Sequence, residues 1–223
     1  MSLDLRTLRS PTRRRDKRTP RLVIIGAMLR SPYPVRMPAT PQHTATQLLR
    51  DVGTRLPHSA RVASQASKVS DFLEDRWSGA VVDAAWLHDI GYSPAVSSSG
   101  LHPLDGARWL RDEGFCEDTC SLVAWHTGAI HEARERGLED ELSEFAPPSR
   151  TALDALTWAD LTSSPTGEPV SPETRLNEIL DRYEPGSAVW RAITAGRIGL
   201  LESAERIEQL LEADRPDVVP SSG

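Results

Sequence analysis

The sequence predicts an all-α protein built as a single helical bundle. Apolar residues recur at helical spacing in one segment after another, and Pro or Gly stands at the ends of most of these segments. Alternating strand patterns of four or more residues are essentially absent. The 223 residues, 39% of them hydrophobic, suit one globular domain with tails. We expect the domain at 41–213, between a disordered basic N-terminal extension at 1–40 and a disordered tail at 214–223.

The first three expected helices lead to the most apolar part of the chain. Residues 44–56 form the first. Residues 56–77 follow, with Pro57 in the first turn and an apolar stripe made by Val62, Ala66, Val69, Phe72 and Leu73. Residues 79–91 are apolar almost throughout, which is typical of a central buried helix, and Gly91 ends it.

The next two helices are separated from a later group by a charged segment. Residues 102–114 and 116–128 both end in glycine, which favours a helix stop at each. Residues 129–148 are rich in charge and close with two prolines, so we expect a mobile segment there.

Three more helices complete the predicted bundle. Residues 149–164 are amphipathic, and 171–183 begin with Ser171 as N-cap and Pro172 in the first turn. A long last helix is expected at 187–213.

Charge is distributed unevenly along the chain, whose net charge is −6. Residues 1–36 hold ten basic and two acidic residues, against sixteen basic and thirty acidic in the remainder. The basic extension could contact nucleic acid weakly, but the acidic body argues against nucleic acid as the main partner, since phosphate binding needs the opposite sign. No apolar run approaches the roughly 20 residues of a membrane span, and we expect a cytoplasmic protein that binds no membrane.

The stretch AAWLHDIGYSP (84–94) places His88 and Asp89 among residues that look like core. Burying an imidazole and a carboxylate costs several kcal/mol unless each is paired or bound to a metal. Three more histidines lie at or near the ends of apolar helices, and a later helix carries an aspartate on an apolar face; they are His58, His102, His126 and Asp160. Taken singly, each could be a hydrogen-bonded core residue, but the recurrence favours a metal site, and His with Asp suits Zn, Fe, Mn or Co.

The order His58, His88-Asp89, Asp160 resembles the HD-domain superfamily of metal-dependent phosphohydrolases. The segments AWLHDI, HPLDGARWL, WHTG and WAD are similar to the corresponding segments of members with six ligands and two metals, over about residues 43–182. The fold implied is a helical HD domain with its metal site where helix ends converge.

The resemblance also implies a ligand set and a reaction. A first divalent ion would be held by His58, His88, Asp89 and Asp160, and a second by His102 and His126, with Asp89 as the bridge. The expected cofactors are divalent ions of Fe, Mn, Co, Zn or Mg, two in the full ligand set, although a centre with one ion is also open. The expected reaction is hydrolysis of a phosphate ester or anhydride of a small molecule, and a nucleotide is the expected substrate.

Besides Asp89, two residues are candidates for catalytic roles. Arg61 lies three residues after His58, on the same helix face, and could hold the substrate phosphate. His131 is a candidate general acid. Many phosphodiesterase relatives have Lys at the position of Tyr92, and no lysine follows Lys68 in this chain. A lysine-assisted mechanism is therefore excluded for the body of the protein. The substrates of those relatives cannot be transferred to this chain.

Two other functions remain open at this point. Some members of the superfamily with the same six ligands are mixed-valent di-iron oxygenases. One branch of these oxygenases has an extra Glu between the HD pair and the next His. Residues 90–112 of this chain contain no Glu, which counts against that branch. The third possibility is a non-catalytic domain that binds nucleotide and holds its metals structurally. The sequence does not specify the oligomeric state.

Overall fold

The computed structural model describes residues 39–214. The predicted extension at 1–40 and the predicted tail at 214–223 therefore lie almost entirely outside the described residues. Only residues 39, 40 and 214 of these two segments are described. Within the described range the chain is helical, and the one β-type contact is an isolated bridge between Ser163 and Pro169. The all-α prediction is confirmed for this range. None of its helices has the length and apolar character to cross a membrane.

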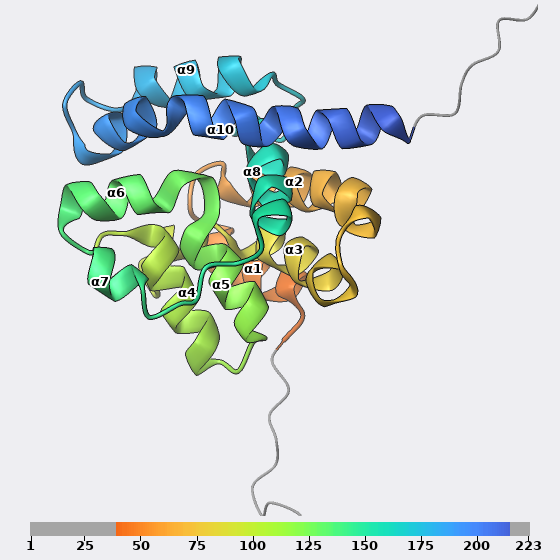
Figure 1. Cartoon of the computed structure of the whole chain (residues 1–223). Helices are drawn as coiled ribbons and strands as arrows, with labels where there is room; N and C mark the ends of the chain where they lie inside the picture. The colour runs from red at the N-terminus through yellow and green to blue at the C-terminus, as the bar shows by residue number, and fades with distance from the viewer. Residues whose placement is uncertain (1–38, 215–223) are drawn as a thin grey trace, which may run out of the picture. The chain divides into compact units, whose positions relative to one another are not determined.

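Ten α-helices are present between residues 39 and 214, and short 3-10 turns follow three of them (Figure 1). In chain order the helices are α1 Pro41–Leu49, α2 Arg55–Val69, α3 Asp75–Leu87, α4 His102–Asp112, α5 Glu117–Trp125, α6 Ala129–Arg136, α7 Glu139–Leu142, α8 Arg150–Leu161, α9 Pro172–Arg182 and α10 Ala188–Ala213. The 3-10 turns are Ser70–Phe72, Ile90–Tyr92 and His126–Gly128.

Serine hydroxyls begin the last three helices. Ser149, Ser171 and Ser187 are the N-caps of α8, α9 and α10, and each hydroxyl accepts a hydrogen bond from the backbone N–H three residues later. Such a bond satisfies one of the free N–H groups at a helix start. These serines therefore determine where α8, which carries Asp160, begins, and where α9 and α10, which cover the site, begin.

Three regions differ from the sequence predictions. The expected first helix at 44–56 is interrupted, because α1 ends at Leu49 and α2 begins at Arg55. The expected helix at 56–77 is broken, because α2 ends at Val69, and α3 starts only at Asp75. The charged segment 129–148, expected to be mobile, instead contains α6 and α7. Its two buried alanines, Ala129 and Ala133, are four residues apart and give α6 a narrow apolar face that the surrounding charges hide in the sequence.

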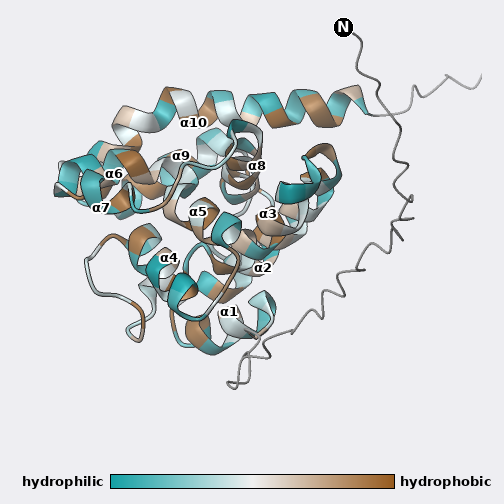
Figure 2. Cartoon of the chain, turned by 60° about the horizontal axis from the view of Figure 1, so that its bottom comes forward, coloured by the Kyte–Doolittle hydropathy of each residue, from teal (hydrophilic) through white to brown (hydrophobic). Residues whose placement is uncertain are grey.

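The apolar residues form a large and a small core. The large core joins α1 to α5 with α6, α7, α8 and α10. The small core consists of Leu161, Leu176, Ile193 and Leu200 and joins α8, α9 and α10. Figure 1 shows α9 and α10 side by side, and Figure 2 shows hydrophobic and hydrophilic residues alternating along α10. The α9–α10 pair thus has its own packing, which places it against the end of α8.

Candidate metal centre

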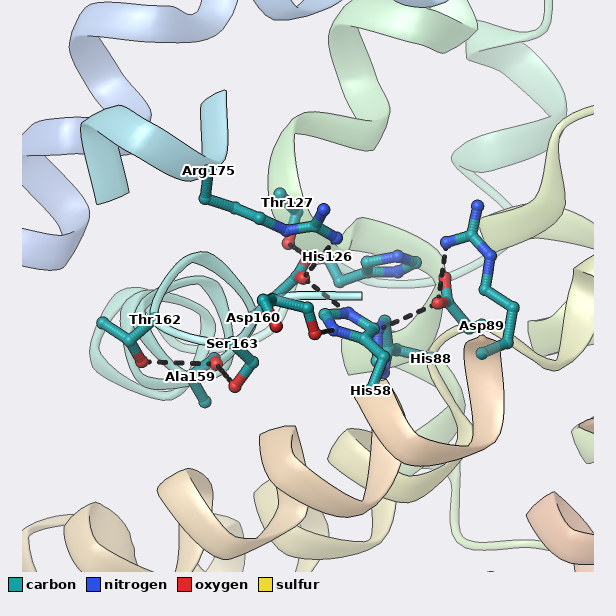
Figure 3. Close-up of polar contacts among 12 residues, drawn as sticks. His58, His88, Asp89, His126, Thr127, Ala159, Asp160, Thr162, Ser163 and Arg175 are labelled. Atoms are coloured by element: carbon teal, nitrogen blue, oxygen red, sulfur yellow. Dashed lines mark hydrogen bonds and ion pairs between the residues drawn. The ribbon is translucent and has the colours of Figure 1, made fainter. Parts of the chain in front are cut away.

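The six histidines and aspartates singled out in the sequence lie together in the structure. Figure 3 labels five of them, His58, His88, Asp89, His126 and Asp160. They form two groups, and within each group one possible ligand atom per residue lies within 4.8 Å of the others. The first group is His58, His88 and Asp160, and the second is Asp89, His102 and His126. They come from α2, the end of α3, the start of α4, the end of α5, and α8.

Gly91 allows the second group to assemble. A Cβ atom on residue 91 would lie 2.0 Å from the backbone oxygen of His102, far inside contact distance. The absence of a side chain therefore lets the first residue of α4 approach the turn that follows Asp89. This close approach brings His102 Nε2 to 3.7 Å from Asp89 Oδ1.

Backbone carbonyls fix the orientation of three imidazoles. The Nδ1 atoms of His58, His88 and His126 lie 3.1, 2.9 and 2.6 Å from the carbonyl oxygens of Ser164, Ala85 and Val123. A carbonyl only accepts hydrogen bonds, so each Nδ1 carries a proton and donates it. In a neutral imidazole of this tautomer, Nε2 has no proton and directs its lone pair toward the middle of the six residues, as in metal-binding histidines.

Two of these three lone pairs, those of His88 and His58, meet no donor, whereas His126 Nε2 lies 3.2 Å from His102 Nε2. His88 Nε2 is buried and has no hydrogen-bond partner. His58 Nε2 lies 3.0 Å from Asp160 Oδ1, so a neutral His58 would turn a lone pair toward a carboxylate. A shared positive charge, either a second proton on the imidazole or a metal ion, removes this repulsion. The donor set therefore fits a divalent metal.

Asp89 faces both groups. Its Oδ2 lies 3.5 Å from His88 Nε2, and its Oδ1 lies 3.7 Å from His102 Nε2. Arg55 of α2 donates from Nη1 to Oδ2 at 2.8 Å. The carboxylate is thus placed between the first and the second group, with one guanidinium as its counterion.

Asp160 is held from two sides by side chains outside the six. Thr127 donates its hydroxyl to Oδ2 at 2.6 Å, and Arg175 Nη2 lies 3.9 Å from Oδ1 (Figure 3). Thr127 has φ 38° and ψ 52°, a left-handed conformation that β-branched residues rarely adopt. The hydroxyl holds Oδ2 and leaves Oδ1 toward His58, while the guanidinium supplies positive charge from beyond hydrogen-bond distance.

Burial keeps the imidazoles of His88 and His102 neutral, and neighbouring charges keep the carboxylates of Asp89 and Asp160 ionised. Burial lowers the pKa of His88 to about 4 and that of His102 well below its ordinary value. Burial alone would raise the pKa of Asp89, but His88 and Arg55 outweigh it, and the pKa falls. For Asp160, His58 and Arg175 likewise outweigh burial and lower the pKa. These are the protonation states that metal ligands need.

Tyr92 lies between a cation and an imidazole. The Arg55 guanidinium lies 3.8 Å from the centre of the Tyr92 ring, and the His102 ring stacks on it at 4.0 Å. Burial, together with the charge of Asp89, raises the pKa of the Tyr92 hydroxyl well above its usual value, so the ring stays neutral. The side chain that replaces the lysine of other sequences therefore positions Arg55 and His102.

A cavity opens above the six residues, and its lining differs from the sequence expectation. Arg55, Arg175 and Arg182 line it, whereas among the described lining residues neither Arg61 nor His131 occurs. The Nε atom of Arg61 is buried without a partner. His131 lies against Gly196 of α10, where a Cβ would come within 2.8 Å of its ring.

Sequence reasoning missed all three cavity arginines, Arg55, Arg175 and Arg182. Arg55 lies three residues before His58 and is therefore its neighbour on the helix surface, on the opposite side of His58 from Arg61. That spacing was a usable signal. Arg175 reaches Asp160 from another helix through packing of α9 on α8, and no local pattern announces such a contact.

The family comparison agrees with this geometry. The family model "HD domain" matches residues 55–186, more than half of the chain. The chain belongs to the HD domain family. The expected superfamily of metal-dependent hydrolases is thereby confirmed, and HD domains bind divalent metals, for which the two His/Asp groups are available. The searches of curated proteins and of solved structures gave no match.

Proposed function

We propose that this HD domain is a phosphohydrolase that uses two divalent ions to hydrolyse a phosphate ester or anhydride of a small molecule. The observation that carries the proposal is the placement of Asp89 between His88 and His102, with the buried His88 Nε2 left without a partner. A carboxylate shared by two groups of imidazoles is suited to two ions rather than one. Nucleotides are the first substrates that we would test.

The six residues would share the ions as the two groups suggest. His58, His88 and Asp160 would hold one ion and His102 and His126 the other, with Asp89 contributing to both. Divalent ions at such a site supply positive charge to a phosphoryl group and activate water at neutral pH. Zn, Fe, Mn and Co all accept this mixture of imidazole and carboxylate, and Mg remains a further candidate.

The protein's own groups would prepare the site before substrate enters. The three backbone carbonyls hold the imidazoles with Nε2 toward the cavity. Arg55 balances the charge of Asp89, and Tyr92 holds Arg55 and His102 in their stack. Arg61 as a phosphate ligand and His131 as general acid stay predictions, although neither lines the described cavity.

The expected partner is a small phosphorylated molecule, because the site opens into a cavity with three arginines. We propose a cytoplasmic enzyme for which neither membrane nor nucleic acid is the substrate. The acidic balance of residues 37–223, with thirty acidic and sixteen basic residues, is in keeping with this.

Metal analysis and a phosphatase panel test the proposal. The purified full chain, loaded with Mn²⁺ and kept anaerobic, should release phosphate from at least one member of a panel of nucleotides and simple phosphate esters. Asp89→Asn should lower the rate at least about 100-fold, because it removes the charge shared by both ions. Asp83→Asn is the matched control, since Asp83 is also on α3 but does not line the cavity.

Two outcomes would reject phosphate hydrolysis. O₂ consumption by the iron-loaded protein, with no phosphate released from any ester, would assign the site to the oxygenase members of the superfamily. Two bound metals with neither O₂ uptake nor phosphate release would assign the metals a structural role.

A further inference from the structure

The cavity has a second wall that the six residues do not explain. It is formed by α9 and α10, which contribute two arginines and several apolar side chains. Its residues include Arg175, Ile179, Arg182, Val189 and Ile193. Three of them are at positions i, i+4 and i+7 of α9, so they share one helix face.

Arg175 is a buried cation with free hydrogen-bonding capacity. It is 3% exposed, and its Nε atom has no hydrogen-bond partner. Its Nη1 donates to Glu178 at 2.6 Å, and its Nη2 lies 3.9 Å from Asp160 Oδ1, beyond hydrogen-bond distance. Figure 3 shows the side chain extending from its helix toward Asp160 and Thr127. A buried guanidinium with open donors is expected to have a further acceptor.

The charges around Arg175 do not balance. Glu178 pairs with Arg175 and also with Arg182, so two guanidinium groups share one carboxylate. Asp160, the other acid near Arg175, is a proposed metal ligand, and its charge would be used there. Glu132 of α6 also lines the cavity, but it is paired with Arg136. The α9–α10 wall therefore keeps an excess of positive charge directed at the cavity.

Apolar side chains lie next to this charge. Ile179 of α9 and Val189 and Ile193 of α10 line the same cavity. They belong to the small α8–α9–α10 core or pack on its edge, so the α9–α10 pair holds them in place. A ligand that fills the cavity would thus meet an anion site and an apolar surface side by side.

We propose that Arg175 binds the phosphate of the substrate and that Ile179, Val189 and Ile193 receive an apolar organic group attached to it. The inference rests on the proposed function and narrows its substrate class to phosphate monoesters with an apolar or aromatic group. A guanidinium presents two parallel N–H donors, which match two phosphate oxygens. The face of a nucleobase and a simple aryl group both offer the apolar surface.

Equilibrium titration with ligands that cannot be hydrolysed tests both parts. Inorganic phosphate and phenylphosphonate are titrated into the full chain loaded with Mn²⁺, and heat is measured. The wild-type protein should bind phenylphosphonate about tenfold more tightly than phosphate, because burying part of an aryl ring adds apolar contact. A nucleoside phosphonate distinguishes the two sources: tighter binding than phenylphosphonate assigns the organic group to a nucleoside, and weaker binding to a simple apolar group.

Variants separate the anion site from the apolar wall. Arg175→Gln should weaken the binding of both ligands about tenfold or more, since it removes a charge-assisted hydrogen bond. Ile179→Ala should reduce the preference for phenylphosphonate and leave phosphate affinity unchanged. Arg197→Gln is the matched control: Arg197 contacts α9 through Asn177 but does not line the cavity, and both affinities should stay as in the wild type.

Unchanged phosphate affinity in Arg175→Gln would overturn the proposal. If that variant does not fold, Arg175→Lys replaces it: the charge is kept but the paired donors are lost, and affinity equal to the wild type would overturn the anion site. Equal wild-type affinities for phosphate and phenylphosphonate would overturn the apolar part without any variant. Binding as expected, with no ester hydrolysed, would instead reject the proposed function and leave this inference standing.

Discussion

Thr127 combines a strained backbone with a hydrogen bond to a proposed metal ligand. Its φ of 38° lies in the left-handed region, where a β-branched residue costs about 1–3 kcal/mol. The hydroxyl donates to Asp160 Oδ2 and so determines which carboxylate oxygen is left to face His58. Strain of this kind persists where the surrounding structure enforces it, and it is concentrated at functional sites.

Replacing Thr127 separates its hydroxyl from its shape. Thr127→Val keeps a β-branched side chain but removes the donor, so the Asp160 carboxylate is free to rotate. Affinity for Mn²⁺ should fall about tenfold, as for other groups that orient metal ligands. Thr127→Ser retains the donor and should bind metal as the wild type does. Equal Mn²⁺ affinity in Thr127→Val and wild type, measured by calorimetry, would show that the hydrogen bond positions nothing.

Single residues also show which parts of the site can be read from sequence. His58, His88, His102 and His126 could be grouped because each lies at or near the end of an apolar helix, and helix ends converge in a bundle. Arg175 could not, because its distance to Asp160 depends on how α9 packs, which is decided by Leu161 and Leu176 in the small core.

Most helices were predictable from periodicity and caps, and the failures have physical reasons. The last two predicted segments, 171–183 and 187–213, agree with α9 and α10 to within about a residue, since Ser171 and Ser187 mark their starts. α6 was missed, because its face is narrow and its other residues are mostly charged. The turn at 70–74 was also missed. The apolar stripe of the predicted helix 56–77 continues to Leu73, although the α-helix has already ended at Val69.

Gly91 shows how a turn between helices supports the site. Gly91→Ala places a methyl group 2.0 Å from the His102 carbonyl, so α4 must move away from Asp89. The free energy of unfolding should fall by about 1–3 kcal/mol or more, as in other overpacked sites. Metal bound per chain should fall too.

Gly79→Ala is the matched control for this prediction. Gly79 lies within α3, and a Cβ there would meet no atom within 4 Å. Alanine should raise the free energy of unfolding by up to about 1 kcal/mol, because it favours the helix. Urea unfolding measures both variants, and equal stabilities of Gly91→Ala and wild type would contradict the close approach of α4.

At the scale of the whole molecule, the proposed function is concentrated in one part of the chain. The family match covers 55–186, and the cavity is lined by residues between Arg55 and Ile193. Residues 1–36 carry ten of the 26 basic residues and lie outside the described range.

Removal of residues 1–36 should therefore leave metal content and phosphate release unchanged. The shortened chain keeps sixteen basic and thirty acidic residues, so its isoelectric point should fall while its melting temperature stays close to that of the full chain. Calorimetric melting and metal analysis of both chains measure this. A large drop in melting temperature would show that the extension contributes to the folded domain.

The metals should also stabilise the molecule, because the six proposed ligands come from five helices that are distant in sequence. Without ions, the buried His88 Nε2 has no partner, and His58 Nε2 and the Asp160 carboxylate need a shared positive charge, so the empty site opposes the packing of α2, α3 and α8. A metal ion whose free concentration is 100 times its dissociation constant adds about 2.7 kcal/mol to the free energy of unfolding. For a domain of this size, chelation of bound Mn²⁺ by EDTA should lower the melting temperature by about 5–10 °C. Asp89→Asn, which is expected to bind metal poorly, should show a much smaller response. Identical melting curves for the wild type with Mn²⁺ and with EDTA would mean that the helices converge without any help from a cation.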